Sequence, residues 1–188
     1  DGIRDAQESR GLGDVYKRQV RCYLFSLHLK SFDVIHEFGS GSGNNLLLLS
    51  SIFPHKRIIG YDWVLPAVKI ANEIGQQTHK KVEGRIFDMY NPDFSIKAGK
   101  NSAVLTVHAL EQLGKRYKNM LDFFMRMKPS LVLHYEPIVE LYNKENIFDL
   151  MAIWYNKERG YLKGYLPALR KMELDGKIEI LYCCRPFI

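Results

Sequence analysis

The sequence predicts an α/β fold in which a mostly parallel sheet is doubly wound, with helices on both of its faces. Short and almost continuously apolar segments alternate with helical ones, which is the pattern of strands buried on both faces of a parallel sheet. A length of 188 residues fits one domain. Because 46% of the residues are hydrophobic and 12% are aromatic, the chain has enough apolar surface to form a buried core.

The elements follow from hydrophobic periodicity and from the turn residues between them. Strands are predicted at residues 34–38, 57–62, 81–87, 102–107 and 131–135, with a last one at 177–183 after a turn at Asp175 and Gly176. Helices are predicted at 44–53, 66–77 and 113–127, with one or two more across 146–173 that break at Gly160, Gly164 and Pro167. Residues 20–30 are expected to be a short helical or extended stretch.

The first nineteen residues differ from the rest of the chain. They show neither helical nor strand periodicity and contain few large apolar side chains. Their end, GLGDVYKRQ, resembles the translated end of a sequencing adapter. We therefore expect residues 1–19 to be a non-native scar or a disordered arm, and residues 20–188 to be the folded domain.

Composition excludes several classes of protein. The net charge of +6, from 27 basic and 21 acidic residues, is spread along the chain and does not specify nucleic acid. The three cysteines form no CxxC pair, which excludes a disulfide scaffold and a structural zinc site, and no other metal site is indicated. No apolar run reaches the roughly 18 residues that span a bilayer. We expect a cytoplasmic protein with a small-molecule partner, and neither a membrane nor a specific nucleic acid as partner.

A glycine-rich loop follows the first predicted strand. The segment runs Glu37-Phe38-Gly39-Ser40-Gly41-Ser42-Gly43, and glycines at these positions permit a tight turn and a close approach of a ligand to the backbone. The dinucleotide fingerprint G-x-G-x-x-G needs its third glycine at position 44, which is Asn44. A carboxylate beside the loop disfavours a pyrophosphate and suits a cationic ligand.

Two further acids end the next two strands. Asp62 stands where an acid hydrogen-bonds the ribose hydroxyls of an adenosine ligand. Asp88 is placed to accept a hydrogen bond from an adenine amine, and Trp63 and Met89 would supply flat or apolar surface for the ring. The carboxyl ends of parallel strands meet at one edge of the sheet, so these loops are expected to converge there.

These motifs resemble those of the class I S-adenosylmethionine-dependent methyltransferases, over roughly residues 33–184. EFGSGSG matches the family's first motif, YDW its second and FDMY its third. The resemblance implies a Rossmann-like fold and S-adenosylmethionine as the cofactor. It places the glycine loop against the methionine part, with Glu37 near the amino group, Asp62 on the ribose and Asp88 on the adenine. In that family a further antiparallel strand closes the sheet, so we expect a chain truncated at both ends and a fifth strand with an unpaired edge.

Four residues after the fourth and fifth strands are candidates for the proton acceptor. His108 has an ordinary pKa near 6.5, suitable for a general base, and Glu111 lies three residues further on, where it could orient His108. His134 lies at the end of the fifth predicted strand, and Glu136 follows it. Each of these side chains could instead serve only a structural hydrogen bond or a helix cap.

The sequence leaves the methyl acceptor open. The aromatic C-terminal half favours a small hydroxylated molecule, such as a sugar. A methyltransferase acting on the nitrogen of an amine or a protein is the nearest alternative. A fragment that binds the cofactor without turnover is another, whereas Asn44 disfavours a nicotinamide-dependent oxidoreductase.

Overall fold

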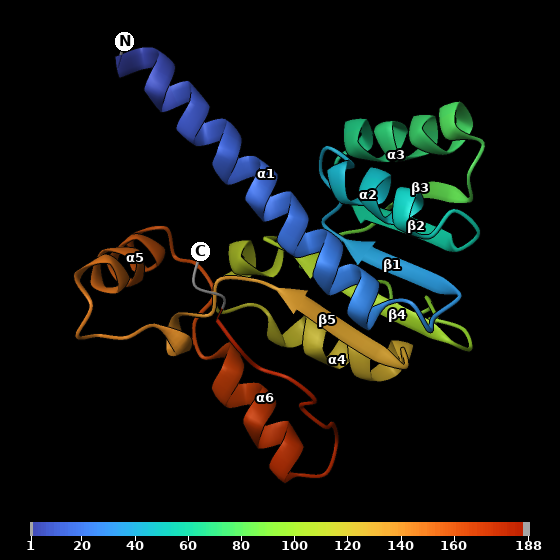
Figure 1. Ribbon diagram of the computed structural model, residues 1–188. Helices are drawn as coiled ribbons and strands as arrows, with labels where there is room; N and C mark the ends of the chain where they lie inside the picture. Colours follow the sequence, from blue (N-terminus) through green and yellow to red (C-terminus); the bar gives the residue numbers. More distant parts are fainter. Residues whose placement is uncertain (1, 186–188) are drawn as a thin grey trace.

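A five-stranded, fully parallel sheet forms the centre of the protein (Figure 1). The computed structural model describes residues 2–185, and side chains from residue 15 onward. The strands are β1 (Val34–Phe38), β2 (Arg57–Asp62), β3 (Val82–Ile86), β4 (Ser102–Val107) and β5 (Leu131–Tyr135). Their order in the sheet is β3-β2-β1-β4-β5, so the order reverses between β1 and β4. In open sheets of this type a ligand site forms outside the carboxyl ends of the strands at that reversal.

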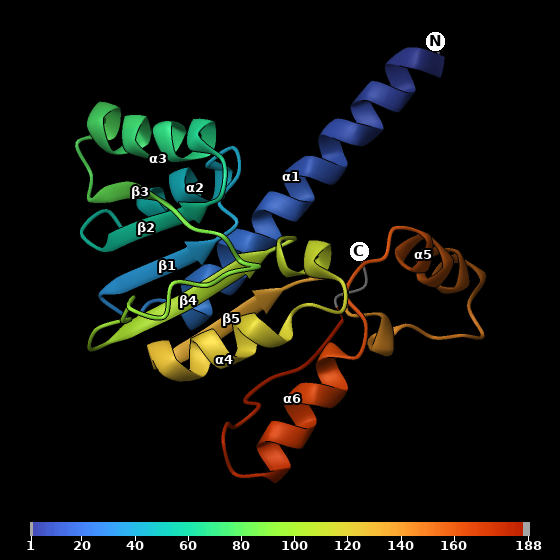
Figure 2. The same cartoon turned by 180° about the vertical axis from the view of Figure 1, so that it is seen from behind.

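Helices cover both faces of the sheet, as the sequence predicts (Figure 2). One face packs against α1 (Gly2–His28), α2 (Asn44–Ile52) and α3 (Leu65–Thr78). The other packs against the 3-10 helix η1 (Leu110–Leu113), α4 (Lys118–Met127) and α6 (Tyr165–Leu174). After the 3-10 helix η2 (Val139–Leu141), α5 (Ile147–Glu158) lies away from the sheet.

The first segment of the chain is helical, contrary to expectation. The single helix α1 includes all but the first of the residues for which we predicted no regular structure. Its C-terminal end is anchored, because Phe25 and, just beyond the helix, Leu29 are fully buried in the core. Extending an anchored helix costs far less than starting one, so polar residues without an apolar stripe can continue it.

Three other expectations need correction. Residues 177–183 form no strand, and Leu181 and Tyr182 in this segment are exposed. A strand needs a neighbouring strand to pair with, which an apolar pattern alone does not supply. The helix predicted from residue 113 begins only at Lys118, after η1 and a turn. Pro167 does not break α6, since it lies in the first turn, where proline is tolerated.

The described residues contain neither a membrane-spanning helix nor a cluster of metal-binding side chains. Across residues 2–185, no helix combines the length and the apolar character required to cross a bilayer. In the same part of the chain, no group of three or more His, Cys, Asp or Glu side chains is arranged to hold a metal ion.

Candidate functional site

The loop that joins β1 to α2 is a tight turn built from glycines. Gly39, Gly41 and Gly43 all have positive φ, at 79°, 49° and 74°. The N–H groups of Gly39 and Ser40 both donate to the carbonyl oxygen of Tyr61, at 2.8 and 3.0 Å. A Cβ at Gly39 would lie 2.4 Å from the Cβ of Ala109, whereas a Cβ at Gly41 would meet no atom within 4 Å. A Cβ at Gly43 would lie 2.6 Å from Cδ1 of Ile74, so the loop is closely packed at both ends and open at Gly41.

Glu37 lies at the end of β1, completely buried beside this loop. Its Oε1 accepts a hydrogen bond of 2.7 Å from Nδ2 of Asn45, and Oε2 has no hydrogen-bond partner among the described residues. Burial raises the pKa of the Glu37 carboxyl to about 8. A buried carboxyl with one free oxygen and a raised pKa has the chemistry of a site that a cation would complete.

Asp62 connects the glycine loop to the end of β2. Its Oδ2 accepts a hydrogen bond of 2.8 Å from the N–H of Gly41, and its Oδ1 accepts one of 3.2 Å from the N–H of Val64. The negative charge of Asp62 also helps to raise the pKa of Glu37, so the structure brings these two predicted acids together. Each oxygen of Asp62 keeps a further lone pair for a hydroxyl donor.

The loop after β3 reaches the same place through its backbone and Met89. The N–H of Phe87 donates to the carbonyl oxygen of Asp62 at 2.9 Å. The Cε of Met89 lies 3.7 Å from the position that a Cβ would occupy on Gly39. Ala109, which follows β4, also contacts the glycine loop. The loops after β2, β3 and β4 therefore converge on the glycine loop that follows β1.

Three predicted cofactor residues occupy different surroundings. Asp88 closes its own turn, accepting bonds of 2.8 Å from the N–H of Tyr90 and from Nδ2 of Asn91, which lower its pKa. Trp63 is 74% exposed and so is open to a ligand. Ser40 is buried, and its unpaired Oγ faces β2, since it lies 3.0 Å from the Cβ position of Gly60.

His108 and Glu111 form a pair at the carboxyl end of β4. Nδ1 of His108 lies 3.6 Å from Oε2 of Glu111, and the His108 side chain is 58% exposed. Glu111 raises the pKa of His108. The ring packs edge-on against Tyr135 with centroids 5.7 Å apart. The arrangement places an exposed imidazole beside a carboxylate, which is the geometry that a general base and its orienting acid require.

His134 does not have the exposure that a general base needs. Its Nδ1 lies 2.8 Å from Oγ1 of Thr106, and its Nε2 lies 2.8 Å from the hydroxyl of Tyr165. Both ring nitrogens are thus occupied, and burial lowers the pKa of His134 to about 4. Its geometry supports a structural role in place of the predicted catalytic one.

The carboxylate of Glu136 accepts hydrogen bonds from backbone N–H groups that follow β4. Its Oε1 accepts bonds of 3.1 Å from the N–H groups of both Ala109 and Leu110, and its Oε2 accepts one of 3.3 Å from the N–H of Glu111. Burial raises its pKa, against the lowering effect of these bonds. Glu136 therefore positions the loop that carries His108 and Glu111, and this replaces its expected role as a base.

Sequence reasoning missed two residues of the site. Asn45 is the hydrogen-bond donor to Glu37, and the amide of Asn45 accepts a bond of 2.9 Å at Oδ1 from Nη1 of Arg21. Asn45 stands at the start of the helix that follows the glycine loop, and this position in the sequence could have identified it as a neighbour of the loop. Arg21 lies in α1, in a region without a recognisable motif, and no sequence signal linked it to the loop.

Solved structures with the same arrangement of strands and helices are known, although the sequence matches no protein-family profile and no curated protein. The N-terminal domain of EvdMO1, crystallised in the presence of SAH and D-fucose, superposes with a TM-score of 0.50 at 20% identity, over 62% of this chain and 48% of that one. The StiE O-MT, residues 961–1257, gives a TM-score of 0.50 at 20% identity, over 68% and 46% of the two chains.

Coclaurine N-methyltransferase, bound to N-methylheliamine and SAH, gives a TM-score of 0.50 at 14% identity, over 58% of this chain and 32% of that one. The chain thus spans less than half the length of each of these three proteins. With its sheet order, its glycine loop and these neighbours, the chain has the fold of the class I S-adenosylmethionine-dependent methyltransferases.

Proposed function

We propose that this protein binds S-adenosylmethionine at the glycine loop and transfers its methyl group to a hydroxyl of a small acceptor, such as a sugar. The observation that carries the proposal is the buried carboxyl of Glu37, two residues before Gly39, with one oxygen paired to Asn45 and the other without a partner among the described residues. The ammonium group of a methionine moiety would complete the site by stabilising the charged form of this carboxyl, a form that would repel a phosphate.

The residues around the loop fit the remaining parts of this ligand. Arg21 reaches the same cluster through Asn45 and supplies a cation for the carboxylate of the methionine part. Asp62 has lone pairs left for the ribose hydroxyls, and Asp88 for the adenine amine. Trp63, which is exposed, and Met89, which packs on the loop, offer surface to the adenine ring. S-adenosylmethionine supplies a methyl group on a sulfonium, which is a good leaving group.

His108 is the proposed general base for the acceptor hydroxyl. Its Nδ1 faces Glu111, and within residues 15–185 its Nε2 has no hydrogen-bond partner, so Nε2 is the nitrogen open to an acceptor. In the proposed transfer Nε2 of His108 would accept the hydroxyl proton as the acceptor oxygen takes the methyl group, which S-adenosylmethionine would supply with its thioether as the leaving group. Glu136 contributes by fixing the backbone between residues 109 and 111. Most of the acceleration in such a transfer comes from alignment of the two reactants.

A sugar is the first acceptor class to test. The EvdMO1 domain was crystallised in the presence of D-fucose together with SAH, which supports a hydroxylated acceptor for this fold. Coclaurine N-methyltransferase, in contrast, is named as acting on nitrogen, so the amine alternative stays in the same test. The cytoplasmic location also belongs to the proposal, supported by the free thiols of Cys22, Cys183 and Cys184.

Calorimetric titration with S-adenosylmethionine and, separately, with NAD tests the cofactor. We expect binding of S-adenosylmethionine only, and about tenfold or greater weakening in Asp62→Ala, because two backbone bonds and the ribose contacts are lost. Asp93→Ala, at an exposed turn, is the matched control and should bind normally. Unchanged affinity in Asp62→Ala would remove Asp62 from the site.

Mass spectrometry of reactions with hydroxylated sugars, amines and peptides tests the acceptor. A methylated sugar supports the proposal, and a methylated amine or peptide favours the nitrogen-directed alternative. Tight cofactor binding without any methylated product would indicate a binding protein without turnover.

A further inference from the structure

Helix α5 presents its apolar side to solvent. Six large apolar side chains along it are between 44% and 76% exposed: Ile147, Phe148, Leu150, Met151, Trp154 and Tyr155. At 100° per residue these positions form one continuous face about 160° wide. The buried residues of the same helix are polar, namely Asp149 and Asn156. The amphipathic pattern of α5 is therefore inverted relative to a helix that packs on a core.

Polar contacts hold α5 in this orientation. Both oxygens of Asp149 pair with the guanidinium of Arg185, and Oδ2 also accepts a bond of 2.7 Å from the N–H of Asn143. The side chain of Asn146 caps the start of the helix by accepting from the N–H groups of Phe148 and Asp149, at 2.9 and 3.3 Å. Rotating the apolar face inward would break these contacts, so its exposure is a property of the fold.

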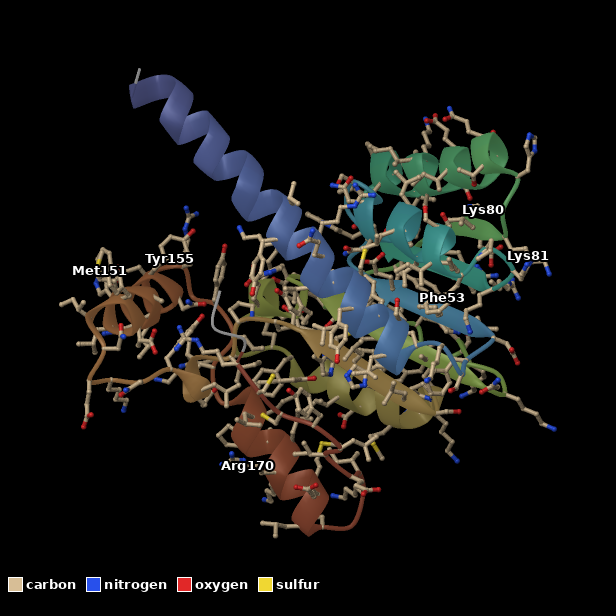
Figure 3. All side chains as sticks on the ribbon, viewed as in Figure 1. Phe53, Lys80, Lys81, Met151, Tyr155 and Arg170 are labelled. Atoms are coloured by element: carbon tan, nitrogen blue, oxygen red, sulfur yellow. The ribbon has the colours of Figure 1, made fainter. Side chains whose placement is uncertain are left out.

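No residue of α5 belongs to either of the two cores found among the described residues. Figure 1 shows α5 apart from the sheet, on the side toward which the arrowheads of β1 and β5 point. In Figure 3 Met151 and Tyr155 lie on this outlying helix, far from Lys80 and Lys81 at the other side of the molecule. Exposed apolar patches of this kind mark interaction surfaces.

The charges around the face indicate the kind of partner. Four exposed cations lie on and beside α5, at Lys144, Lys157, Arg159 and Lys163. The exposed acids over the same residues are Glu145 and Glu158, and the whole chain carries a net charge of +6. Apolar and aromatic side chains flanked by Lys and Arg are the composition of helices that lie in the interface of an anionic bilayer.

A second copy of the chain fits this face less well. Two α5 helices packed together would bring the cations of both copies close to one another. A 12-residue helix is about 18 Å long, and its contact area falls well below the ~800 Å² per partner of a standard interface. Docking on a bilayer does not bring the cations of two copies together, and it does not need the contact area of a protein dimer.

We propose that the exposed apolar face of α5 docks the protein on a membrane surface rich in anionic lipid. The helix lies in the plane of the interface, with Phe148, Met151 and Trp154 inserted between the lipids and the flanking cations at the headgroups. This revises the expectation that the protein has no membrane partner. The proposal does not depend on the methyltransferase function, and docking would turn the carboxyl edge of the sheet toward the bilayer.

Vesicle binding of the full chain tests the proposal. The probes are vesicles of phosphatidylcholine alone and of an equimolar mixture of phosphatidylcholine and phosphatidylglycerol. We expect co-sedimentation with the mixed vesicles and at least about tenfold weaker binding to the neutral ones. The protein has two tryptophans, so Trp63→Phe leaves Trp154 as the sole tryptophan, and its emission should shift to the blue on the mixed vesicles.

Matched variants distinguish vesicle binding through the α5 face from non-specific binding through other exposed apolar side chains. The triple variant Phe148→Ser, Met151→Ser, Trp154→Ser should lower binding about tenfold or more, because it removes most of the inserted apolar surface. The control triple Tyr23→Ser, Leu174→Ser, Leu181→Ser removes equally exposed apolar side chains elsewhere and should bind like the wild type.

Charge is tested in the same way. Reversing Lys144, Lys157 and Lys163 to Glu should weaken binding to the mixed vesicles about tenfold or more, whereas reversing the exposed Lys81, Lys100 and Lys118 should have a smaller effect. Absence of binding, or equal binding by the α5 triple variant, would overturn the proposal. So would light scattering that shows a dimer which the α5 triple variant dissolves, because the face would then join two copies.

Discussion

Asn45 donates a hydrogen bond of 2.7 Å to Oε1 of Glu37, while Oε2 of the same carboxyl is buried without a partner. This bond joins the start of α2 to the end of β1, and it satisfies only one of the two oxygens of the Glu37 carboxyl. Leaving such a buried group unpaired costs about 1–3 kcal/mol. The proposed ligand would remove that cost, and this relationship leads to the first prediction.

Binding of S-adenosylmethionine near pH 7 should release close to one proton. With a pKa of about 8, Glu37 is mostly protonated at pH 7, and an ammonium group beside it favours the charged carboxylate. Calorimetry in two buffers of different ionisation enthalpy measures the release. Glu37→Gln should release none and bind about tenfold more weakly, because a charge-assisted bond is lost.

Glu83→Gln is the control for this experiment, since Glu83 is a surface acid of β3 paired with Arg57 and Arg85. Its proton release should equal that of the wild type. If the wild type binds without releasing a proton, Glu37 does not hold the ammonium group.

Gly39→Ala should destabilise the protein and weaken cofactor binding. The new Cβ would lie 2.4 Å from the Cβ of Ala109, and the residue has a φ of +79°. Strain and overpacking together should cost about 2–4 kcal/mol in the free energy of unfolding, measured by denaturant titration.

Two variants divide that cost between its causes. Gly99→Ala has the same backbone strain at φ +81° but open space around it, and it should cost only the smaller, conformational part. Adding Ala109→Gly to Gly39→Ala removes the clash. The double variant should therefore recover the part of the unfolding free energy by which Gly39→Ala falls below Gly99→Ala. No recovery in the double variant would mean that the contact between the two loops is not what Gly39 protects.

Glu111→Gln should move the pH profile of methyl transfer to lower pH. His108 acts as a base only when it is unprotonated, and Glu111 raises its pKa, so the acidic limb of the profile reports that raised value. Removing the carboxylate lowers the pKa of His108 and shifts the limb downward. Glu145→Gln, at an exposed position away from the pair, should leave it unchanged.

The same assay tests His108 directly. His108→Ala should keep most of the cofactor affinity, since the proposed cofactor contacts do not include His108, and should lose most of its turnover. Undiminished turnover would exclude His108 as the base.

Acid should destabilise the fold through its buried histidines. The pKa of His36 and of His134 is lowered to about 4 by burial, while in the unfolded chain both titrate near 6.5. The unfolded state therefore binds more protons between pH 6.5 and 4. The stability that each histidine provides is complete above pH 6.5 and is lost as the pH falls through this window, by an amount on the order of 3 kcal/mol each.

Denaturant titrations from pH 7 to pH 4.5 measure this loss. In His134→Gln the slope of unfolding free energy against pH should fall by about one proton, because the amide keeps hydrogen-bonding capacity but does not titrate. His55→Gln, at an exposed position, should keep the full slope. If the wild type, His134→Gln and His55→Gln have equal slopes of unfolding free energy against pH, His134 is not buried in its neutral form.

The four strands at residues 34–38, 57–62, 102–107 and 131–135 have the bounds that the sequence predicts. A strand buried on both faces has to be a nearly continuous apolar run, and glycine, proline or charged residues mark its ends. Residues 177–183 show a similar pattern and yet form no strand. Strand formation depends on a free neighbouring edge in the right place, and local pattern does not contain that information.

The helical boundaries show the same limit. The predicted helix at 113–127 starts five residues later, because residues up to Leu113 belong to η1, which Glu136 caps, and the chain turns at Gly114 with a φ of 58°. The helical state of residues 2–19 follows from the anchoring of α1 at Phe25 and not from the pattern of those residues.

Sequence alone determined the parallel sheet, the glycine turn and the acids beside it, since these depend on residue type and spacing within short segments. It offered His108 as the first candidate base, with His134 and Glu136 as alternatives, because all three lie at the carboxyl ends of β4 and β5. Tertiary packing decided between them. Tyr165, thirty-one residues further along the chain, occupies one ring nitrogen of His134, three backbone N–H groups occupy Glu136, and His108 alone of the three stays exposed. The protonation and reach of a side chain depend on its burial and partners, and distant parts of the chain supply both.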